Sequence, residues 1–156
     1  MASYISKIFG TKNEVETTMV FIRDFLHVPY SAYNNGEAAV ERNIAKQLVE
    51  EFDRDNVKTQ YAVGGFLNLK CDIDLYDGKC GIELKLSKSL TASELQRVIG
   101  QVFYYSQRVY KNTGLILLVV GTKEEIDPKL KELKNIVEQI PGVHFMYKQA
   151  KNSNKK

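Results

Sequence analysis

The sequence predicts an α/β domain in which an antiparallel meander is extended by parallel strands and helices cover both faces of the sheet. Three observations support this prediction. Two segments with amphipathic helical spacing precede the strands, Asp77-Gly78 is a strong hairpin signal, and the apolar run Leu115–Val120 lies between two glycines. With 156 residues, of which 44% are hydrophobic, the chain is long enough for one domain with its own core.

Two helices are expected before the first strand. Thr11-Lys12-Asn13-Glu14 has the form of a capping box, which predicts a helix that ends near Leu26. Pro29 and the turn Asn34-Asn35-Gly36 end this unit, and a second helix begins near Gly36. The expected buried positions are Val15, Met19, Ile22, Phe25 and Leu26 in the first helix and Val40, Ile44, Leu48 and Phe52 in the second.

Three strands are expected next. Val57–Val63 has strand composition, Gly64-Gly65 indicates a tight turn, and Phe66–Tyr76 is predicted as the second strand. Asp77-Gly78 is typical of a two-residue hairpin turn, so Lys79–Leu86 would pair with the second strand as the third.

The remaining segments alternate between helix and strand. Thr91-Ala92-Ser93-Glu94 has capping-box form and begins a long helix that reaches Val109. The run Leu115–Val120 is typical of a fully buried strand. A helix over about 126–140 and a short strand, Val143–Tyr147, complete the predicted fold. The expected buried side of the long helix consists of Leu95, Val98, Ile99, Val102, Ser106 and Val109.

Charge, cysteine content and hydropathy exclude several classes of protein. The segment 148–156 contains four lysines and no acid, so we expect one domain over 1–150 and a solvated, disordered basic tail over 151–156. Two cysteines, Cys71 and Cys80, are too few for a disulfide framework. No apolar run reaches the roughly 18 residues of a membrane helix, and the first residues do not resemble a signal peptide. We therefore expect a cytoplasmic protein without a membrane partner.

The predicted hairpin brings several charged residues to one face of the sheet. A two-residue turn at Asp77-Gly78 places Asp74 opposite Gly81 and Asp72 opposite Glu83. Since alternate residues of a strand share a face, Asp72, Asp74, Glu83 and Lys85 are expected on one side. The other side would carry Ile73, Leu75, Ile82, Leu84 and both cysteines.

Two carboxylates that face each other across a strand pair repel and cost stability. A divalent cation such as Mg²⁺, which prefers oxygen ligands, would offset that repulsion. Lys85 would add a positive charge beside it, and Gly81 would leave space for a substrate backbone. The alternative is a solvent-facing surface that is charged without any catalytic role.

The order of these motifs resembles the PD-(D/E)XK nuclease superfamily. Its core consists of a helix, a three-strand meander, a helix and a strand, which corresponds to about residues 36–121 here. Asp72 matches the family's acid on the second strand and Glu83-Leu84-Lys85 matches its acid-x-lysine motif, although Cys71 replaces the motif's proline. The resemblance implies a restriction-endonuclease-like αβββαβ core, a mixed central sheet flanked by helices, with an extra N-terminal helix and a C-terminal αβ extension.

The resemblance also implies a metal-dependent nuclease that hydrolyses phosphodiester bonds with metal-activated water. Mg²⁺ is the implied cofactor, and Mn²⁺ would substitute for it. Lys85 would be the catalytic lysine, and Gln101, which the family pattern places on the following helix, would orient Lys85 or a substrate phosphate. The implied metal ligands are Asp72, Glu83, the Leu84 main-chain carbonyl and Glu41, the last directly or through water. A bulge or slipped register would bring Asp74 to the metal in place of Asp72.

Nucleic acid is the expected partner, and DNA is favoured over RNA. Candidate contact residues are Lys88, Arg97, Tyr105 and Arg108, the arginines through phosphate groups. Single-stranded, duplex and branched substrates, cleavage at ends or internally, and roles in repair, recombination or defence are all compatible with the sequence. A homodimer or a larger DNA-processing complex would enlarge the grip of so small a chain. The alternative hypothesis is a catalytically silent domain of the nuclease fold that binds nucleic acid or acts as a scaffold.

Overall fold

The computed structural model describes residues 4–152. Its elements are α1 (Tyr4–Phe9), α2 (Glu14–Asp24), α3 (Tyr30–Asn34), α4 (Glu37–Phe52), η1 (Arg54–Asn56), β1 (Val57–Ala62), β2 (Lys70–Leu75), β3 (Cys80–Leu86), η2 (Ser87–Ser89), α5 (Ala92–Tyr105), η3 (Ser106–Tyr110), β4 (Leu115–Gly121), α6 (Pro128–Val137) and β5 (Val143–Gln149). The short helices α1 and α3 were not expected from the sequence.

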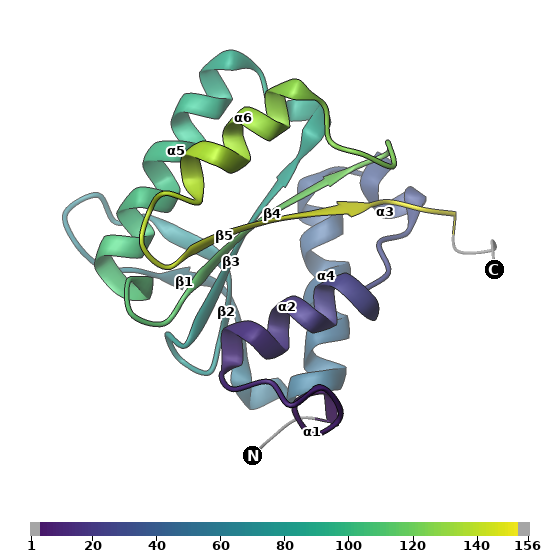
Figure 1. Cartoon of the computed structure of the whole chain (residues 1–156), viewed down its shortest axis with the longest axis vertical. Helices are drawn as coiled ribbons and strands as arrows, with labels where there is room; N and C mark the ends of the chain where they lie inside the picture. The colour runs from purple at the N-terminus through teal and green to yellow at the C-terminus, as the bar shows by residue number, and fades with distance from the viewer. Residues whose placement is uncertain (1–3, 153–156) are drawn as a thin grey trace.

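The five strands form one open mixed sheet in the order β1-β2-β3-β4-β5. The pairs β1–β2 and β2–β3 are antiparallel, whereas β3–β4 and β4–β5 are parallel. Helices α5 and α6 lie on one side of the sheet, and α1, α2 and α4 lie on the other (Figure 1). This arrangement confirms the predicted α/β class, the meander with its parallel extension, and helices on both faces.

Each face of the sheet has its own apolar core, and β4 contributes to both. Ile116, Leu118 and Val120 pack toward α2 and α4, whereas Leu115, Leu117 and Val119 pack toward α5 and α6; every β4 side chain is buried. Burial of a leucine or isoleucine side chain contributes about 1.5–3 kcal/mol. The predicted central strand is therefore confirmed, and it holds the two helical layers together.

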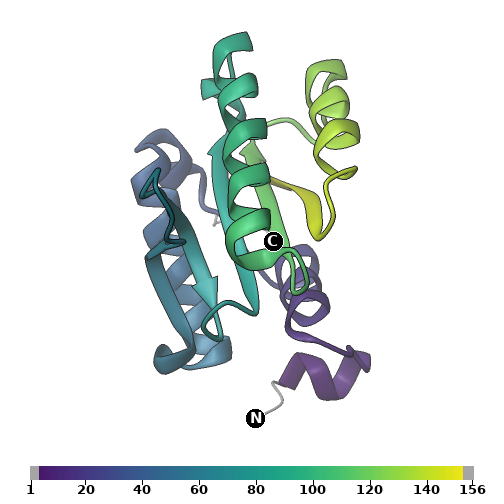
Figure 2. The same ribbon diagram turned by 90° about the vertical axis from the view of Figure 1, so that its left-hand side faces the viewer.

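Helix α4 lies along the β1–β2 hairpin, which Figure 2 shows from the side. Its predicted apolar stripe is confirmed, since Val40, Ile44, Leu48 and Phe52 are all buried. The residues on the adjoining flank of α4 therefore lie close to the first two strands. This packing places the acidic beginning of α4 near the charged part of β2.

Side-chain caps begin the helices, although one cap differs from the prediction. Asn13, rather than Thr11, caps α2: its side chain accepts a hydrogen bond of 2.9 Å from the Glu16 amide. Glu16 in turn accepts from the Lys12 amide, so the capping motif lies two residues beyond the expected one. Thr91 caps α5 as predicted, through the Glu94 amide.

The β1–β2 connection is longer than expected, and the second strand is shorter. Residues 63–69 form a loop in which Gly64 and Gly65 have positive φ and the Asn68 amide donates to the Gly65 carbonyl. The connection between β2 and β3 spans 76–79 instead of two residues, and Tyr76 and Asp77 have positive φ. The residues that pair across β2 and β3 nevertheless agree with the prediction, because the four-residue connection and the predicted two-residue turn are both centred on Asp77-Gly78.

Helix α5 ends at Tyr105, and a π-helical turn over Ser106–Tyr110 replaces its expected last turn. The wider turn changes which side chains face the sheet. Tyr105, Ser106 and Tyr110 are buried, whereas Val109 is only partly buried. The predicted burial of Val98, Val102 and Ser106 is confirmed.

The basic C-terminal segment is structured as far as it is described. Lys148 belongs to β5, and its ammonium donates to the carbonyls of Ile22 and Arg23 at 2.8 and 3.0 Å, which caps the last turn of α2. The Lys151 amide donates to the Val28 carbonyl, and its own carbonyl accepts from the Tyr30 amide. The expected disordered tail is therefore wrong at residue 151, and residues 153–156 lie outside the described part.

None of the helices in the described range 4–152 combines the length and the apolar composition needed to cross a bilayer.

Candidate active site

Strands β2 and β3 separate at Asp72. Their backbone pairing extends from Leu75–Cys80 to Ile73–Ile82 and does not continue to Asp72 and Glu83. The Leu84 amide instead donates to Asp72 Oδ2 at 2.8 Å, and the Asp72 amide lies 3.4 Å from Glu83 Oε1. The two carboxylates therefore lie side by side where the strands diverge, each in contact with the backbone of the other strand.

The backbone of β1 is also unusual beside Asp72. Gln60 would pair with Asp72 in the β1–β2 register, but it has φ 52° and is absent from the ladder. Its side-chain amide donates to Asp72 Oδ1 at 3.3 Å and to Glu41 Oε1 at 2.9 Å. A left-handed conformation is uncommon for a residue other than glycine and is concentrated at functional sites. Gln60 thus connects the acid of β2 to the acid of α4.

Lys85 completes this group on β3. Its ammonium lies 3.3 Å from Glu83 Oε2, and the two side chains are 13% and 3% exposed. Asp72, Glu83 and Lys85 therefore occur together as the sequence predicts, and Glu41 reaches the same place from α4 through Gln60. The structure thus brings four predicted site residues together: Glu41, Asp72, Glu83 and Lys85. These four residues and Gln60 are called the carboxylate cluster below.

Asp74 does not join the carboxylate cluster. It is fully buried, its Oδ1 accepts from the Tyr110 hydroxyl at 2.6 Å, and its carboxylate accepts from the Gly78 amide at 3.0 Å. These contacts close the hairpin turn and attach it to the end of η3. The expectation that Asp74 shares the site with Asp72 is therefore wrong for this arrangement, because the hairpin turn and Tyr110 hold Asp74.

Gly81 leaves no room for a substrate, contrary to the sequence-based expectation. A Cβ atom at Gly81 would lie 2.5 Å from the Tyr110 ring, so this ring already fills the space. The expected face of Cys71 is also wrong. Cys80 packs with α2 and α4, but Cys71 packs with α5 and α6, because strict alternation is lost where β2 leaves β3 at Asp72.

Burial, with like charges as the second cause, shifts the pKa values of the acids in the cluster. Burial, and then the charge of Asp72, raise the pKa of Glu83 to about 8, and the opposing effect of Lys85 is smaller. Burial and Asp72 also raise the pKa of Glu41 above its ordinary value. Several carboxylates buried beside a single lysine destabilise a fold rather than stabilise it. Acids with strongly shifted pKa values are concentrated at functional sites.

Glu37 is a fourth acid near the cluster that the sequence did not single out. Burial is the largest cause that raises its pKa, Asp72 raises it further, and Lys85 lowers it. Glu37 and Glu41 are four residues apart and therefore share one flank of α4. That spacing was a usable signal for Glu37, whereas no pattern in the sequence pointed to Gln60.

Gln101 and Tyr105 lie one turn apart on α5, and both face inward. Gln101 Oε1 is buried and has no hydrogen-bond partner among the described residues 4–152. Tyr105 is 1% exposed, and its hydroxyl donates to the Lys70 carbonyl at 2.9 Å. The burial of Tyr105 leaves no ring face for a base, so its expected nucleic-acid contact is replaced by a packing role between α5 and β2.

The other three predicted contact residues lie at the surface in different settings. Lys88 donates to the Tyr33 carbonyl at 3.0 Å, and its ammonium lies 4.4 Å from the Tyr33 ring centroid. Arg97 is 69% exposed and forms an ion pair of 3.3 Å with Glu94. Arg108 is exposed beside the loop 63–69. Lys88 is thus held against α3, whereas the two arginines present their charge to solvent.

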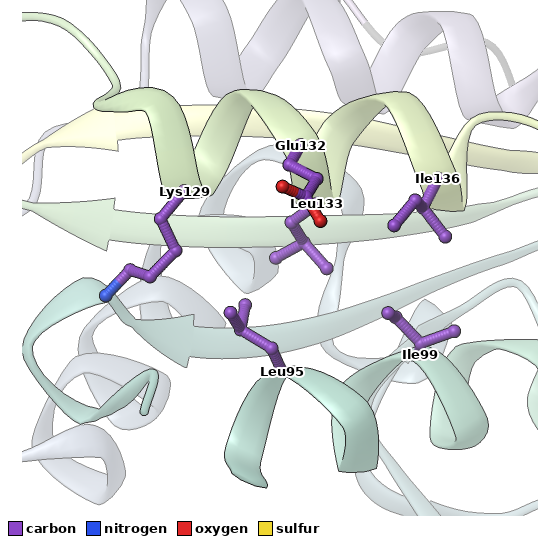
Figure 3. A pocket seen from close by; sticks show the side chains of 6 residues that line it. All are labelled: Leu95, Ile99, Lys129, Glu132, Leu133 and Ile136. Atoms are coloured by element: carbon purple, nitrogen blue, oxygen red, sulfur yellow. The ribbon is translucent and has the colours of Figure 1, made fainter. Parts of the chain in front are cut away.

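A separate hollow lies between α5 and α6 (Figure 3). Leu95 and Ile99 of α5 face Leu133 and Ile136 of α6 across it, and Glu132 also lines it. The ammonium of Lys129 at its border donates to the Leu90 carbonyl at 2.8 Å. Most of its lining is apolar, and its two titratable side chains, Lys129 and Glu132, include a single carboxylate, which is too few to hold a metal ion. The carboxylate cluster is therefore the better candidate for an active site.

The described residues 4–152 contain no three His, Cys, Asp or Glu side chains already arranged to hold a metal ion. Two contacts from within the protein occupy the acids of the cluster: the Gln60 amide donates to both Glu41 and Asp72, and Lys85 pairs with Glu83. Comparisons of the chain with protein-family models, with curated proteins and with solved structures found no match.

Proposed function

We propose that the protein is a metal-dependent nuclease that hydrolyses phosphodiester bonds of nucleic acid, with DNA as the favoured substrate. The observation that carries this proposal is the meeting of Asp72, Glu83 and Lys85 where β2 and β3 separate. Glu41 approaches the same point from α4. The restriction-endonuclease-like fold belongs to this proposal as its expected architecture.

The chemistry of the donor set fits Mg²⁺. Glu41, Asp72 and Glu83 supply the carboxylate oxygens that this ion prefers, and the Leu84 carbonyl would be a further ligand. When bound, Mg²⁺ would neutralise charge on the phosphate and lower the pKa of a water molecule. The raised pKa values of Glu83 and Glu41 are consistent with a cation here, because burial and Asp72 disfavour the charged forms of both acids and a cation would favour them. Mn²⁺ would substitute for Mg²⁺.

Two further side chains would act on the substrate. Lys85 would leave Glu83 and present its ammonium to the oxygen that gains negative charge during the reaction. Gln101 has a buried carbonyl oxygen without a donor, and a buried acceptor in that state costs about 1–3 kcal/mol. The Lys85 ammonium or an ordered water would supply that donor, so Gln101 would position the groups that react.

A second function is a catalytically silent domain that binds nucleic acid or acts as a scaffold. The hydrogen bonds of Gln60 to both acids and the Lys85–Glu83 ion pair favour it, because they satisfy the cluster from within the protein. A nuclease would have to release both contacts on binding metal. A silent domain would keep them.

A cleavage assay separates the two functions. Single-stranded, duplex and branched DNA and single-stranded RNA would be incubated with Mg²⁺, Mn²⁺ or EDTA. The proposal expects cleavage that depends on metal, is lost in Asp72→Asn and Lys85→Ala, and persists in Lys79→Ala, a matched change at an exposed lysine of the same hairpin. Cleavage that survives both site variants would refute the assigned site, and binding without cleavage would favour the silent domain.

A further inference from the structure

The loop 63–69 at the tip of the β1–β2 hairpin exposes two apolar side chains. Phe66 is 100% exposed and Leu67 is 56% exposed. An isolated exposed leucine is ordinary on protein surfaces, but a completely exposed phenylalanine ring gains nothing from folding. The loop projects from the molecule beside the C-terminal half of α5 (Figure 1). The exposed Phe66 ring therefore does not contribute to folding, and its position suits contact with another molecule.

Several contacts hold this loop in one conformation. The Tyr104 hydroxyl donates to the Gly64 carbonyl at 3.2 Å and accepts from the Leu67 amide at 3.3 Å. Gly64 and Gly65 have positive φ, and a Cβ atom at Gly65 would lie 2.9 Å from Arg108 Nε. The Tyr104 side chain of α5 thus bonds to both halves of the loop, and Arg108 of η3 packs against Gly65. The exposure of Phe66 follows from this fixed backbone.

The loop lies near the carboxylate cluster and has basic neighbours. It joins the strand that carries Gln60 to the strand that carries Asp72. The six residue-to-residue steps from Phe66 to Asp72 span at most about 20 Å, a few nucleotides of a bound strand. Arg108, which lies beside Gly65, and Lys70, which follows the loop in the chain, are both exposed, and the segment 63–69 has no acid. An exposed aromatic ring with nearby cations suits the bases and phosphates of a nucleic acid.

We propose that Phe66 stacks on an unpaired base of a nucleic acid whose backbone lies along Arg108 and Lys70. The inference rests on the proposed nuclease function and narrows its substrate to strands with unpaired bases, such as single strands, overhangs and flaps. Inside an uninterrupted duplex each base is stacked on both faces, so away from the two ends a rigid side chain finds no face to cover. The single ring of Phe66 matches one base better than the wide apolar surface of a protein partner.

The chain contains no tryptophan, which permits a direct measurement. Phe66→Trp introduces one tryptophan at the loop, and Phe25→Trp introduces one at a 47% exposed phenylalanine beyond α2, in the opposite helical layer. Fluorescence would be recorded in EDTA during titration with a single-stranded DNA, a single-stranded RNA and a blunt duplex of the same sequence. We expect quenching of the tryptophan fluorescence only in Phe66→Trp and only with the single strands. Comparison of the single-stranded DNA with the single-stranded RNA shows which of the two the loop binds more tightly.

Affinity provides a second readout in the native background. Phe66→Ala should weaken single-strand binding by about 5- to 150-fold, the range for loss of one aromatic–base stack, whereas Phe25→Ala should leave it unchanged. Thermal melting of each variant in the absence of nucleic acid would show whether it is folded. Unchanged affinity in Phe66→Ala, equal quenching by the blunt duplex, or no binding of any strand would overturn the inference.

The measurement in EDTA also separates this inference from the proposed function. Quenching by single strands without cleavage in Mg²⁺ would leave the stacking inference standing and refute the nuclease. Cleavage in Mg²⁺ without quenching would refute the stacking inference alone, and the exposed ring would then be a contact for a protein partner.

Discussion

Glu83→Gln should make the protein more stable at neutral pH and inactive as a nuclease. Glu83 is 2% exposed, and burial together with the charge of Asp72 raises its pKa from 4.5 to about 8. Because the folded-state pKa is above that of the unfolded chain, folding favours the protonated acid. The stability contributed in this way is complete below about pH 4.5 and is lost as the pH rises through about 8.

The size of this effect follows from the pKa difference. Each unit of difference corresponds to about 1.4 kcal/mol, so native Glu83 would cost about 3 kcal/mol of unfolding free energy at pH 7 and about 5 kcal/mol above pH 8. Glutamine has nearly the same shape as the protonated acid and carries no charge, but its amide replaces the acid's 3.3 Å contact with Lys85 imperfectly. We therefore expect a net gain on the order of 2 kcal/mol at pH 7 to 8 and no gain near pH 4.5.

The assay is urea denaturation in EDTA between pH 4.5 and pH 8, followed by circular dichroism. Glu50→Gln, a change at an exposed acid of α4, is the matched control and should follow the native protein at every pH. Repeating the series with Mg²⁺ should raise native stability near pH 8 and leave Glu83→Gln unchanged, because only the native cluster would bind the ion. Parallel pH profiles for native protein and Glu83→Gln would refute the argument from burial and charge.

Three further results are expected. Tyr110→Phe removes the 2.6 Å hydrogen bond to buried Asp74 and should lower the unfolding free energy by about 1–3 kcal/mol in urea, with cleavage retained; loss of cleavage without loss of stability would return Asp74 to the active site. Lys148→Ala removes two hydrogen bonds to the last turn of α2 and should cost about 1 kcal/mol by the same measurement, and an unchanged value would show that this cap contributes nothing. Burial raises the pKa of Cys71 well above its usual range and that of Cys80 to about 12, so neither thiol should react with a thiol reagent at pH 8 until the protein unfolds; fast labelling of the native protein would contradict their burial.

Local patterns in the sequence were enough for the sheet and for the central trio of the candidate site. The apolar run Leu115–Val120 predicted the strand that β4 forms, and the stripe of α4 predicted its buried face. The pairing of Asp74 with Gly81 followed from Asp77-Gly78 even though the real connection is longer, because both turns are centred on the same point of the chain. Alternation along β3 then placed Glu83 and Lys85 on one face.

The finer composition of the site depended on contacts between residues far apart in the chain. Alternation along β2 predicted that Asp72 and Asp74 lie on the same face of the sheet, both available to the site. In the structure, hydrogen bonds from the Tyr110 hydroxyl and the Gly78 amide hold Asp74 away from the site. Gln60 reaches the cluster because its backbone is in the left-handed conformation, which no pattern in the sequence predicts. Whether such a side chain belongs to the site depends on contacts with residues that are distant in the sequence and become neighbours only in the folded chain.

The sequence by itself determined the α/β class, the strand order of the meander and the presence of Asp72, Glu83 and Lys85 on neighbouring strands, because these features depend on periodicities of two and 3.6 residues. Tertiary structure alone decided that Tyr105 faces inward, that Cys71 changes sides and that β2 leaves β3 at Asp72. The physical reason is that periodicity specifies a side-chain direction only while an element keeps its regular geometry, whereas β1 has a left-handed residue at Gln60 and α5 continues into a π-helical turn. Where the strands separate, packing against α4 and α5 decides the direction.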